Sequence, residues 1–530
     1  MNRRDFISST ITAAGCLAAG CAGVAQFGAV QIEEATLAEL AAALAAGRIS
    51  SRGLTELYLH RIALLDRRGP KLRAVITTNP DAQSIAETLD AERRAKGPRG
   101  PLHGIPILLK DNLDTADRMP TTAGSLALAG TFAREDAFVT RRLREAGAVI
   151  LGKTNLSEWA NIRSSHSSSG WSAVGGQTRN PYVLSRNPSG SSSGSAAAVA
   201  ANLCAVAVGT ETDGSIVSPA SCCSLVGLKP TVGLVSRRGI VPISQSQDTA
   251  GPMARTVTDA AILLGAIAGA DAGDAITAES RGQGKTDYTR GLDRKSLEGV
   301  RLGVARQFFG SHPGVDRLME GHLTTLRNLG AVLVDPDKFP TLHAFGDAEF
   351  EVLLYEFKPG LAAYLATRGD SVTIHSLADV IAFNERNHET EMPIFHQETF
   401  LKAEAKGSLA DDAYVNARER CIRLARVDGI EALLAEHRLE AFVAPTSGPP
   451  WLIDHVTGDH GTGGCSSLAA AAGSPHLTVP AGYISGLPVG ISFFGRSWSE
   501  PELLRYGFAF EQATKARRAP RYLPRDTGLS

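Results

Sequence analysis

The sequence predicts an α/β fold, because helical segments are followed directly by short strands that are apolar on both faces. Residues 137–146 have a helical pattern that ends at Gly147, and the apolar run 148–151 comes next. Residues 195–201 form a helix of small residues, and the apolar run 203–208 follows it. Strands without polar alternation are typically buried on both faces. Helices that alternate with such strands are typical of layered α/β domains.

Two further helices are predicted near the start of this domain. Thr36-Leu37-Ala38-Glu39 is a capping box that begins a helix, and Gly47 is a suitable stop. The next helix carries an apolar stripe at helical spacing, formed by Leu54, Leu57, Tyr58, Ile62 and Leu65. Each of these helices would pack its apolar face against a sheet.

One domain is predicted over residues 36–525. No repeat or low-complexity linker divides this range, and α/β folds of such length can form one unit. Residues from about 275 to 440 are more charged and more helical, and Gly-rich, strand-forming sequence returns from about Phe442. We therefore expect a single domain with a helical excursion at about 275–440. Either a monomer or a homodimer is compatible with the sequence.

The charge balance gives no reason to expect a nucleic acid or an anionic membrane as partner. The 530 residues have a net charge of −1, and 21% of them are charged. No block of Lys and Arg occurs in the body of the chain, whereas binding to polyanions needs a basic surface.

Residues 1–30 differ from the rest and are predicted to be an export signal. Arg3 and Arg4 precede an uncharged stretch rich in Ala, Gly, Ser and Thr that reaches Gln31. A twin arginine before such a stretch resembles a Tat signal, which predicts export to the periplasm. Ala18-Ala19-Gly20-Cys21 is similar to a lipobox, so Cys21 is a candidate for a lipid anchor. A flexible cytoplasmic start and a membrane-spanning anchor are the alternatives, although the stretch is poor in Leu, Ile and Phe.

No disulfide, metal site or cofactor is predicted. Outside the signal the cysteines are odd in number, and the adjacent Cys222 and Cys223 cannot bridge comfortably. No C-x-x-C spacing is present, so zinc is not indicated. We expect free, buried thiols, which also suits a protein that folds before Tat export.

The first segment that contains a candidate catalytic residue is 102–112, in which an apolar run ends in Lys110. Most lysines lie on the surface and carry no function. A lysine desolvated by Ile107, Leu108 and Leu109 has a lowered pKa, so that a neutral amine is available as a base.

The second segment is a run of Ser and Gly at 189–195, which is most often a linker. It contains a G-x-S-x-G match centred on Ser192, the pattern of a nucleophile elbow. That elbow needs a strand directly before its first glycine, whereas residues 185–188 have the composition of a turn. The elbow interpretation of Ser192 is therefore rejected.

The third segment, 208–216, follows a buried strand and places Gly214 before Ser215. A glycine before the serine lets backbone N–H groups turn toward one point, as an oxyanion hole requires. The alternative is a tight strand-to-loop turn with a structural serine.

Together the three segments resemble the amidase signature family. The matching stretch runs from Ser189 through Ser215 to Gly227-Leu228-Lys229-Pro230-Thr231, and through Gly239 to Asp248-Thr249-Ala250-Gly251-Pro252-Met253-Ala254-Arg255. The C-terminal matches are Ala444-Pro445-Thr446, Thr478-Val479-Pro480-Ala481-Gly482 and Gly486-Leu487-Pro488-Val489-Gly490. The resemblance covers about residues 36–514, and it implies a mixed central sheet flanked by helices on both faces.

The resemblance implies an amidase that hydrolyses carboxylic amides to acid and ammonia through an acyl-enzyme. Ser215 matches the nucleophile, Ser191 matches the bridging serine that follows a cis peptide in the family, and Lys110 matches the terminal base. The backbone N–H groups of Thr212, Asp213, Gly214 and Ser215 match the oxyanion hole. A serine needs such a base at neutral pH, and Lys110 must lose about 3 pKa units to supply it.

The match departs from the family near the nucleophile. The glycine often found before Gly214 is Asp213 here, and Val217 replaces an arginine that many members carry two residues after the nucleophile. Without that arginine, recognition of a carboxylate beside the scissile amide is not expected. Several segments also look like the bacterial peptide amidases, which remove ammonia from C-terminally amidated peptides: 170–173, 176–181, 209–216, 354–358 and 376–379.

Two other functions stay open. The glutamine-hydrolysing subunit of a tRNA-dependent amidotransferase shares the signature, but the export signal and Val217 disfavour it. A periplasmic binding protein with a vestigial site is disfavoured because Lys110, Ser191 and Ser215 are all present. A histidine base is not expected, since none of the following histidines occupies a catalytic position of the family: His103, His166, His455, His460 and His476.

Overall fold

The computed structural model describes residues 30–336, 339, 341–342, 344–369 and 372–525. The predicted export signal, including Arg3, Arg4 and Cys21, lies outside the described residues. Within them, no helix is both long and apolar enough to cross a membrane.

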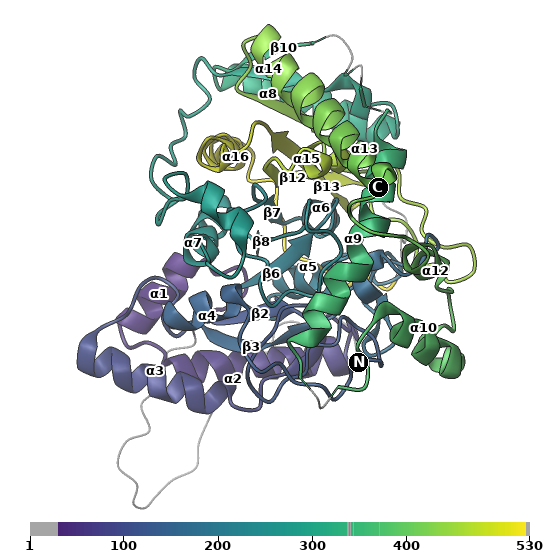
Figure 1. Cartoon of the computed structure of the whole chain (residues 1–530). Coiled ribbons are helices and arrows are strands. Elements are labelled where there is room, and N and C mark those ends of the chain that lie inside the picture. Colours follow the sequence, from purple (N-terminus) through teal and green to yellow (C-terminus); the bar gives the residue numbers. More distant parts are fainter. Residues whose placement is uncertain (1–29, 337–338, 340, 343, 370–371, 526–530) are drawn as a thin grey trace, which may run out of the picture.

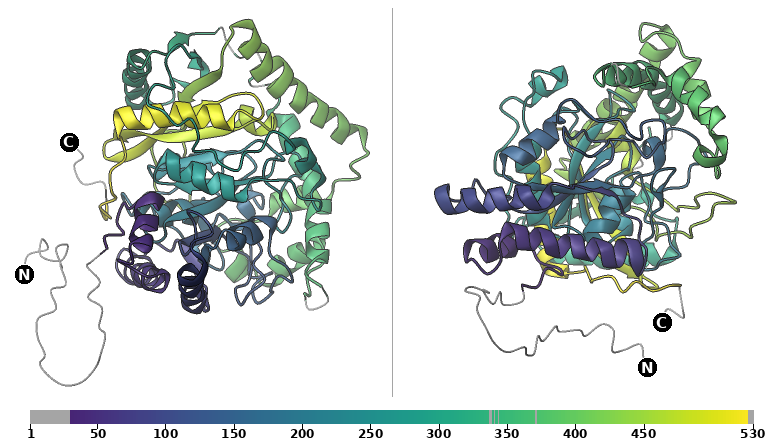
Figure 2. Two further views of the ribbon diagram at one scale, coloured as in Figure 1. Left: turned by 90° about the vertical axis from the view of Figure 1, so that its left-hand side faces the viewer. Right: turned by 90° about the horizontal axis from the view of Figure 1, so that it is seen from below.

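Helices lie on both sides of one large sheet, as Figures 1 and 2 show. The helices are α1 (Leu37–Ala45), α2 (Ser51–Arg61), α3 (Ala82–Lys96), α4 (Phe138–Glu145), α5 (Ser193–Ala200), α6 (Val217–Cys222), α7 (Val257–Ile267), α8 (Pro313–Asn328), α9 (Gly346–Ala366), α10 (Leu377–Arg386), α11 (His388–Glu391), α12 (Glu398–Glu404), α13 (Asp412–Cys421), α14 (Ala432–Glu436), α15 (Ser466–Ala471) and α16 (Glu500–Thr514). The strands are β1 (Val75–Thr78), β2 (Pro106–Lys110), β3 (Val149–Thr154), β4 (Trp171–Ser172), β5 (Gly176–Gln177), β6 (Val206–Glu211), β7 (Val226–Lys229), β8 (Thr249–Ala254), β9 (Arg301–Val304), β10 (Val332–Val334), β11 (Ala441–Pro445), β12 (His476–Ile484) and β13 (Leu487–Phe494).

The main sheet has the order β1-β3-β2-β6-β8-β7-β12-β13-β11-β9-β10, and β4 and β5 form a separate two-stranded sheet. The main sheet is mixed, because β2 pairs in parallel with β3 and β6, while β6 pairs antiparallel with β8. All residues of β2, β3 and β6 are buried. This confirms the predicted fold class, and the burial explains why these strands lack polar alternation.

The N-terminal helices follow the predicted capping and periodicity. Thr36 and Glu39 form the capping box of α1, and Gly47 has a φ of +65° just after the helix ends. The second helix continues as a π-helical segment over Ile62–Arg68. Leu57 differs from its prediction, because 38% of it is exposed whereas Leu54 and Tyr58 are fully buried.

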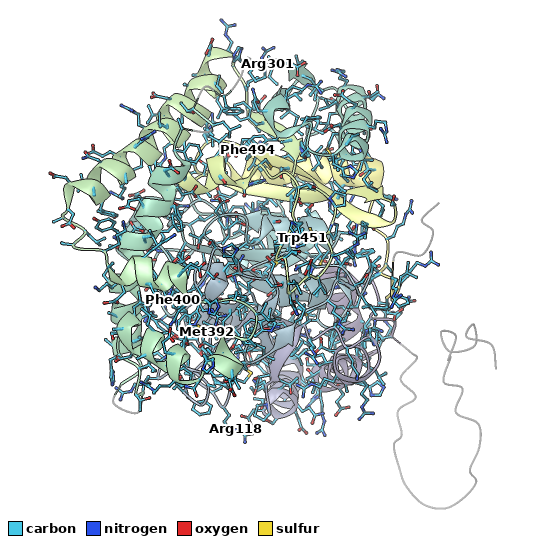
Figure 3. All side chains as sticks on the ribbon, turned by 90° about the vertical axis from the view of Figure 1, so that its right-hand side faces the viewer. Arg118, Arg301, Met392, Phe400, Trp451 and Phe494 are labelled. Carbon is cyan, nitrogen blue, oxygen red and sulfur yellow. The ribbon has the colours of Figure 1, made fainter. Side chains whose placement is uncertain are left out.

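The range 275–440 is mainly helical, but it also contributes the strands β9 and β10 to the main sheet. Its longest helix, α9, packs against α12 and α13 at one side of the sheet (Figure 1). Phe357 of α9 stacks on Phe400 of α12 with ring centroids 5.2 Å apart, in the helical region where Figure 3 labels Phe400. The five cysteines in the described part of the chain are free and buried, as expected.

Candidate active site

Two neighbouring parallel strands carry the site at their carboxyl ends. Leu109 of β2 is paired with Val208 of β6, so Lys110 lies beside the end of β6. The loops that follow parallel strands converge at one edge of a sheet, where ligand sites of open α/β sheets form. This pairing brings Lys110 to the serine segments although they are distant in sequence.

The Lys110 ammonium group is fully buried and hydrogen bonded only to hydroxyl and carbonyl oxygens. Its Nζ donates to Ser191 Oγ at 2.8 Å, to Thr210 Oγ1 at 2.8 Å and to the Thr210 carbonyl at 3.3 Å. Burial lowers the pKa of Lys110 to about 7, against the opposing effect of the carboxylates of Asp248 and Glu211. Lys110 is therefore partly a neutral amine at neutral pH, within hydrogen-bonding distance of a serine hydroxyl.

Backbone hydrogen bonds hold the two serines Ser191 and Ser215 in neighbouring loops. The peptide bond between Gly190 and Ser191 is cis, as the resemblance implies. The N–H of Ser157 donates to the Ser191 carbonyl at 3.0 Å, and the N–H of Ser192 donates to the Ser215 carbonyl at 3.1 Å. Ser215 Oγ makes no hydrogen bond with any described residue. A catalytic hydrogen bond that is open without substrate often forms only in the substrate complex.

Ser192 has a structural environment that excludes it as a nucleophile. Its hydroxyl donates to the Thr210 carbonyl at 3.0 Å and accepts from the Thr210 N–H at 3.2 Å, and the side chain is fully buried. No strand precedes Gly190, so the elbow geometry is absent from this part of the described chain. Ser192 instead joins the serine loop to the end of β6.

The backbone N–H groups of the turn after β6 differ in whether they have a hydrogen-bond partner in the protein. The Gly214 N–H donates to Glu211 Oε1 at 3.0 Å. Within the described residues, no hydrogen bond is donated by the N–H groups of Thr212, Asp213 or Ser215. Thr212 and Ser215 are buried and Asp213 is half-buried. Buried N–H groups are nearly always paired, so these unpaired neighbours mark a place for an acceptor on a ligand. The predicted hole therefore has three available donors, because the fourth, on Gly214, is already bound.

A cavity of about 180 Å³ opens next to both serines, and the residues directly before them, Gly190 and Gly214, line it. Val217 lines it as well, and none of the described residues that line it is a lysine or an arginine. Larger cavities of about 320, 360, 460 and 800 Å³ lie elsewhere, and no residue next in sequence to Ser191 or Ser215 lines them. The small cavity is therefore the candidate substrate site.

A family model for amidases matches residues 53–504 of this chain. The chain belongs to the amidase family. A probable amidase of Arabidopsis thaliana is 46% identical over 501 residues, which cover 93% of this chain and 92% of the plant protein. The structure of native peptide amidase from Stenotrophomonas maltophilia is 54% identical with a TM-score of 0.87, covering 92% of this chain and 99% of that one. A glutamyl-tRNA(Gln) amidotransferase subunit from Halorhodospira halophila is 37% identical over 499 residues, covering 91% of this chain and 98% of that one.

The amidase also has two buried carboxylates in its site for which the sequence predicted no role. Asp248 accepts from the Thr212 hydroxyl at 2.6 Å and from the N–H groups of Ile243 and Ser244 at 2.7 and 2.9 Å. Glu211 is 1% exposed at the end of β6. Both residues lie inside motifs that carry the resemblance, and this position was the sequence signal that could have identified them. Their contacts depend on the folded turn.

None of the described histidines of the amidase is hydrogen bonded to Ser191 or Ser215. His476 Nε2 is bound to Ser492 Oγ at 2.6 Å, and burial with the nearby Lys229 lowers the pKa of His476 to about 3. His103 Nε2 is bound to the Leu89 carbonyl at 2.9 Å. Over the residues described by the structure, no group of three His, Cys, Asp or Glu side chains could hold a metal ion.

Proposed function

We propose that this amidase hydrolyses primary carboxamides with Ser215 as nucleophile, Ser191 as bridge and Lys110 as base, and that its substrates are peptides with a C-terminal amide. The observation that carries the mechanism is the 2.8 Å hydrogen bond from the buried Lys110 amine to Ser191. No other buried base in the described site contacts either serine.

In the first half-reaction, Ser215 Oγ attacks the carbonyl carbon of the amide. Its proton passes to Ser191 Oγ while the Ser191 proton passes to the neutral Lys110 amine. The carbonyl oxygen becomes an oxyanion and accepts hydrogen bonds from the unpaired N–H groups of Thr212, Asp213 and Ser215. When the intermediate collapses, Lys110 returns a proton through Ser191 to the leaving nitrogen. The C–N bond breaks, ammonia departs and Ser215 keeps the acyl group as an ester.

In the second half-reaction, a water molecule attacks the ester carbonyl. Its proton follows the same route through Ser191 to Lys110, and the proton then returns to Ser215 Oγ as the C–O bond of the ester breaks. The products are a carboxylic acid and the free enzyme. One lysine thus acts as base and acid in turn, which requires a pKa close to the working pH. The pKa of about 7 at Lys110 meets this requirement.

The proposal for peptide amides is supported by the cavity and by the comparisons. Val217 contributes an apolar wall where many family members carry arginine, and the described side chains that line the cavity include no lysine or arginine. Such a cavity offers no ion-pair partner to a substrate carboxylate. The 54% identity with a peptide amidase also favours peptide amides.

The test of the substrate class is ammonia release from a panel of amides. We expect amidated dipeptides to give the highest kcat/KM, with simple fatty amides lower and free glutamine lowest, because the glutamine carboxylate finds no cation in the cavity. The matched acids of the same dipeptides serve as product controls. If free glutamine is the best substrate, the peptide-amide proposal is wrong.

The glutamine-hydrolysing component of an amidotransferase is the second candidate, because the chain is 37% identical to such a protein over nearly its whole length. A protein of that kind works with partner subunits on charged tRNA. Co-purification of this chain with a second protein, together with preference for glutamine, would favour it.

We also propose that the chain is exported to the periplasm through its twin arginine. Replacing Arg3 and Arg4 with lysine should hold a tagged precursor in the cytoplasm, because the Tat pathway requires the arginine pair. Cell fractionation followed by immunoblotting measures the distribution. Equal periplasmic amounts with and without the pair would contradict the proposal. Labelling with a fatty acid, compared with Cys21→Ser, tests lipidation separately.

A further inference from the structure

Glu211 is a buried carboxylate whose two oxygens both accept from the turn that carries the nucleophile. Oε1 accepts from the N–H of Gly214 at 3.0 Å, and Oε2 accepts from the N–H groups of Ile216 at 2.7 Å and Val217 at 3.0 Å. The three donors lie on either side of Ser215. One rigid side chain therefore fixes the backbone before and after the nucleophile.

The same contacts determine which backbone N–H groups of the turn have no hydrogen-bond partner in the protein. Gly214 has a φ of +76°, a left-handed conformation that favours glycine, and its N–H is bound to Glu211. Thr212, Asp213 and Ser215 keep N–H groups without a partner among the described residues. A second carboxylate, Asp248, holds the start of the turn through the Thr212 hydroxyl.

Neighbouring groups shift the pKa of Glu211, and Glu211 in turn shifts the pKa of Lys110. Burial raises the pKa of Glu211, whereas the buried Lys229 of β7 and the N–H donors of the turn lower it. Glu211 also raises the pKa of Lys110, as does Asp248, and these two carboxylates are the charged groups that oppose the effect of burial on Lys110. A change at Glu211 must therefore affect both the turn and the base.

We propose that Glu211 is a positioning residue that binds the Gly214 N–H and thereby presents the N–H groups of Thr212, Asp213 and Ser215 to the oxyanion. This inference rests on the proposed Ser215 mechanism. It makes the hole a three-donor site whose geometry is held by a carboxylate that never touches the substrate. Because the oxyanion exists only in the transition state and the tetrahedral intermediate, Glu211 acts on kcat and not on substrate binding.

The experiment compares Glu211→Gln with Glu211→Asp and with a matched control, Glu500→Gln. Glutamine offers a single acceptor oxygen and an NH₂ group, so it cannot receive all three N–H groups. Aspartate keeps the charge but is one methylene shorter. Glu500 is also buried, faces the same Lys229 and accepts the Thr231 N–H at 2.6 Å, but it does not contact the turn.

For Glu211→Gln we expect kcat on a dipeptide amide to fall about 100-fold, with KM within about threefold of the wild type, as for loss of an oxyanion-hole donor. The acid limb of kcat/KM should move to lower pH, because removal of a negative charge disfavours protonated Lys110. Glu211→Asp should lose kcat without that shift. Affinity for a peptide aldehyde, whose adduct carries an oxyanion, should fall in parallel with kcat. Affinity for the matching peptide alcohol should not change.

The control separates positioning from a general loss of folding. Thermal melting gives the folded fraction of each variant, and Glu500→Gln should keep kcat and the pH profile per folded molecule. If Glu211→Gln loses no more kcat than Glu500→Gln, or if the aldehyde binds it as tightly as the wild type, the inference is wrong. Full activity in Ser215→Ala would instead overturn the mechanism on which the inference rests, so the two failures are distinguishable.

Discussion

Replacing Ser215 with alanine should lower kcat for amide hydrolysis by about 10⁴-fold or more, because no acyl-enzyme can form without its hydroxyl. The hydroxyl makes no hydrogen bond with any other described residue, so its removal should leave stability close to that of the wild type. Ammonia release under substrate saturation measures kcat, and thermal melting measures folding. Retention of wild-type activity by Ser215→Ala would end the Ser215 mechanism.

Ser192→Ala is the matched control, since it removes the same atom from a neighbouring buried serine. The Ser192 hydroxyl bonds to both backbone groups of Thr210, and its loss leaves the Thr210 N–H without that partner. We expect the free energy of unfolding to fall by about 1–3 kcal/mol. We expect kcat to stay within about tenfold of the wild type. The opposite result, an inactive Ser192→Ala and an active Ser215→Ala, would support the elbow interpretation that the structure disfavours.

The parts of the fold that could be predicted well from sequence are those fixed by local chemistry. The Thr36–Glu39 capping box determines where α1 begins, and the apolar runs before Lys110 and after Gly147 become the buried strands β2 and β3. Strands β9 and β10 were missed inside the helical range 275–440. They have four and three residues, and β9 is held by pairing with β11, which lies far along the chain. Such long-range pairing has no local signature.

A similar limit applies to the site. The desolvation of Lys110 could be predicted, because three apolar residues precede it on one strand. Its position beside Thr210 depends on the parallel pairing of β2 with β6, which sequence alone does not specify. Glu211 lies within a matched motif, but its role could not be predicted, since it depends on which N–H groups the folded turn directs toward its carboxylate.

The pH–rate profile should show one ionisation near pH 7 that belongs to Lys110. For a neutral amide, kcat/KM should be low below this pH, where Lys110 is protonated, and should rise to a plateau above it, where the amine is neutral. The direction follows from burial, which lowers the pKa of Lys110 to about 7 by penalising its charged form. An unperturbed lysine would place the rise near about pH 10.4. The measurement is kcat/KM for an amidated dipeptide from about pH 5 to 9.

Lys110→Ala should lose about 10²–10⁴-fold in kcat/KM, the usual contribution of a general base, and its remaining activity should no longer follow the ionisation near pH 7. Lys110→Arg is the decisive companion variant. It keeps a cation that can donate to Ser191 and Thr210, but a guanidinium stays protonated in proteins and cannot accept the proton of Ser215. If Lys110 acted only by holding Ser191 in place, Lys110→Arg would retain much of the activity. If Lys110 is the base, Lys110→Arg should be as impaired as Lys110→Ala, and wild-type rates in Lys110→Arg would rule out proton transfer to this lysine.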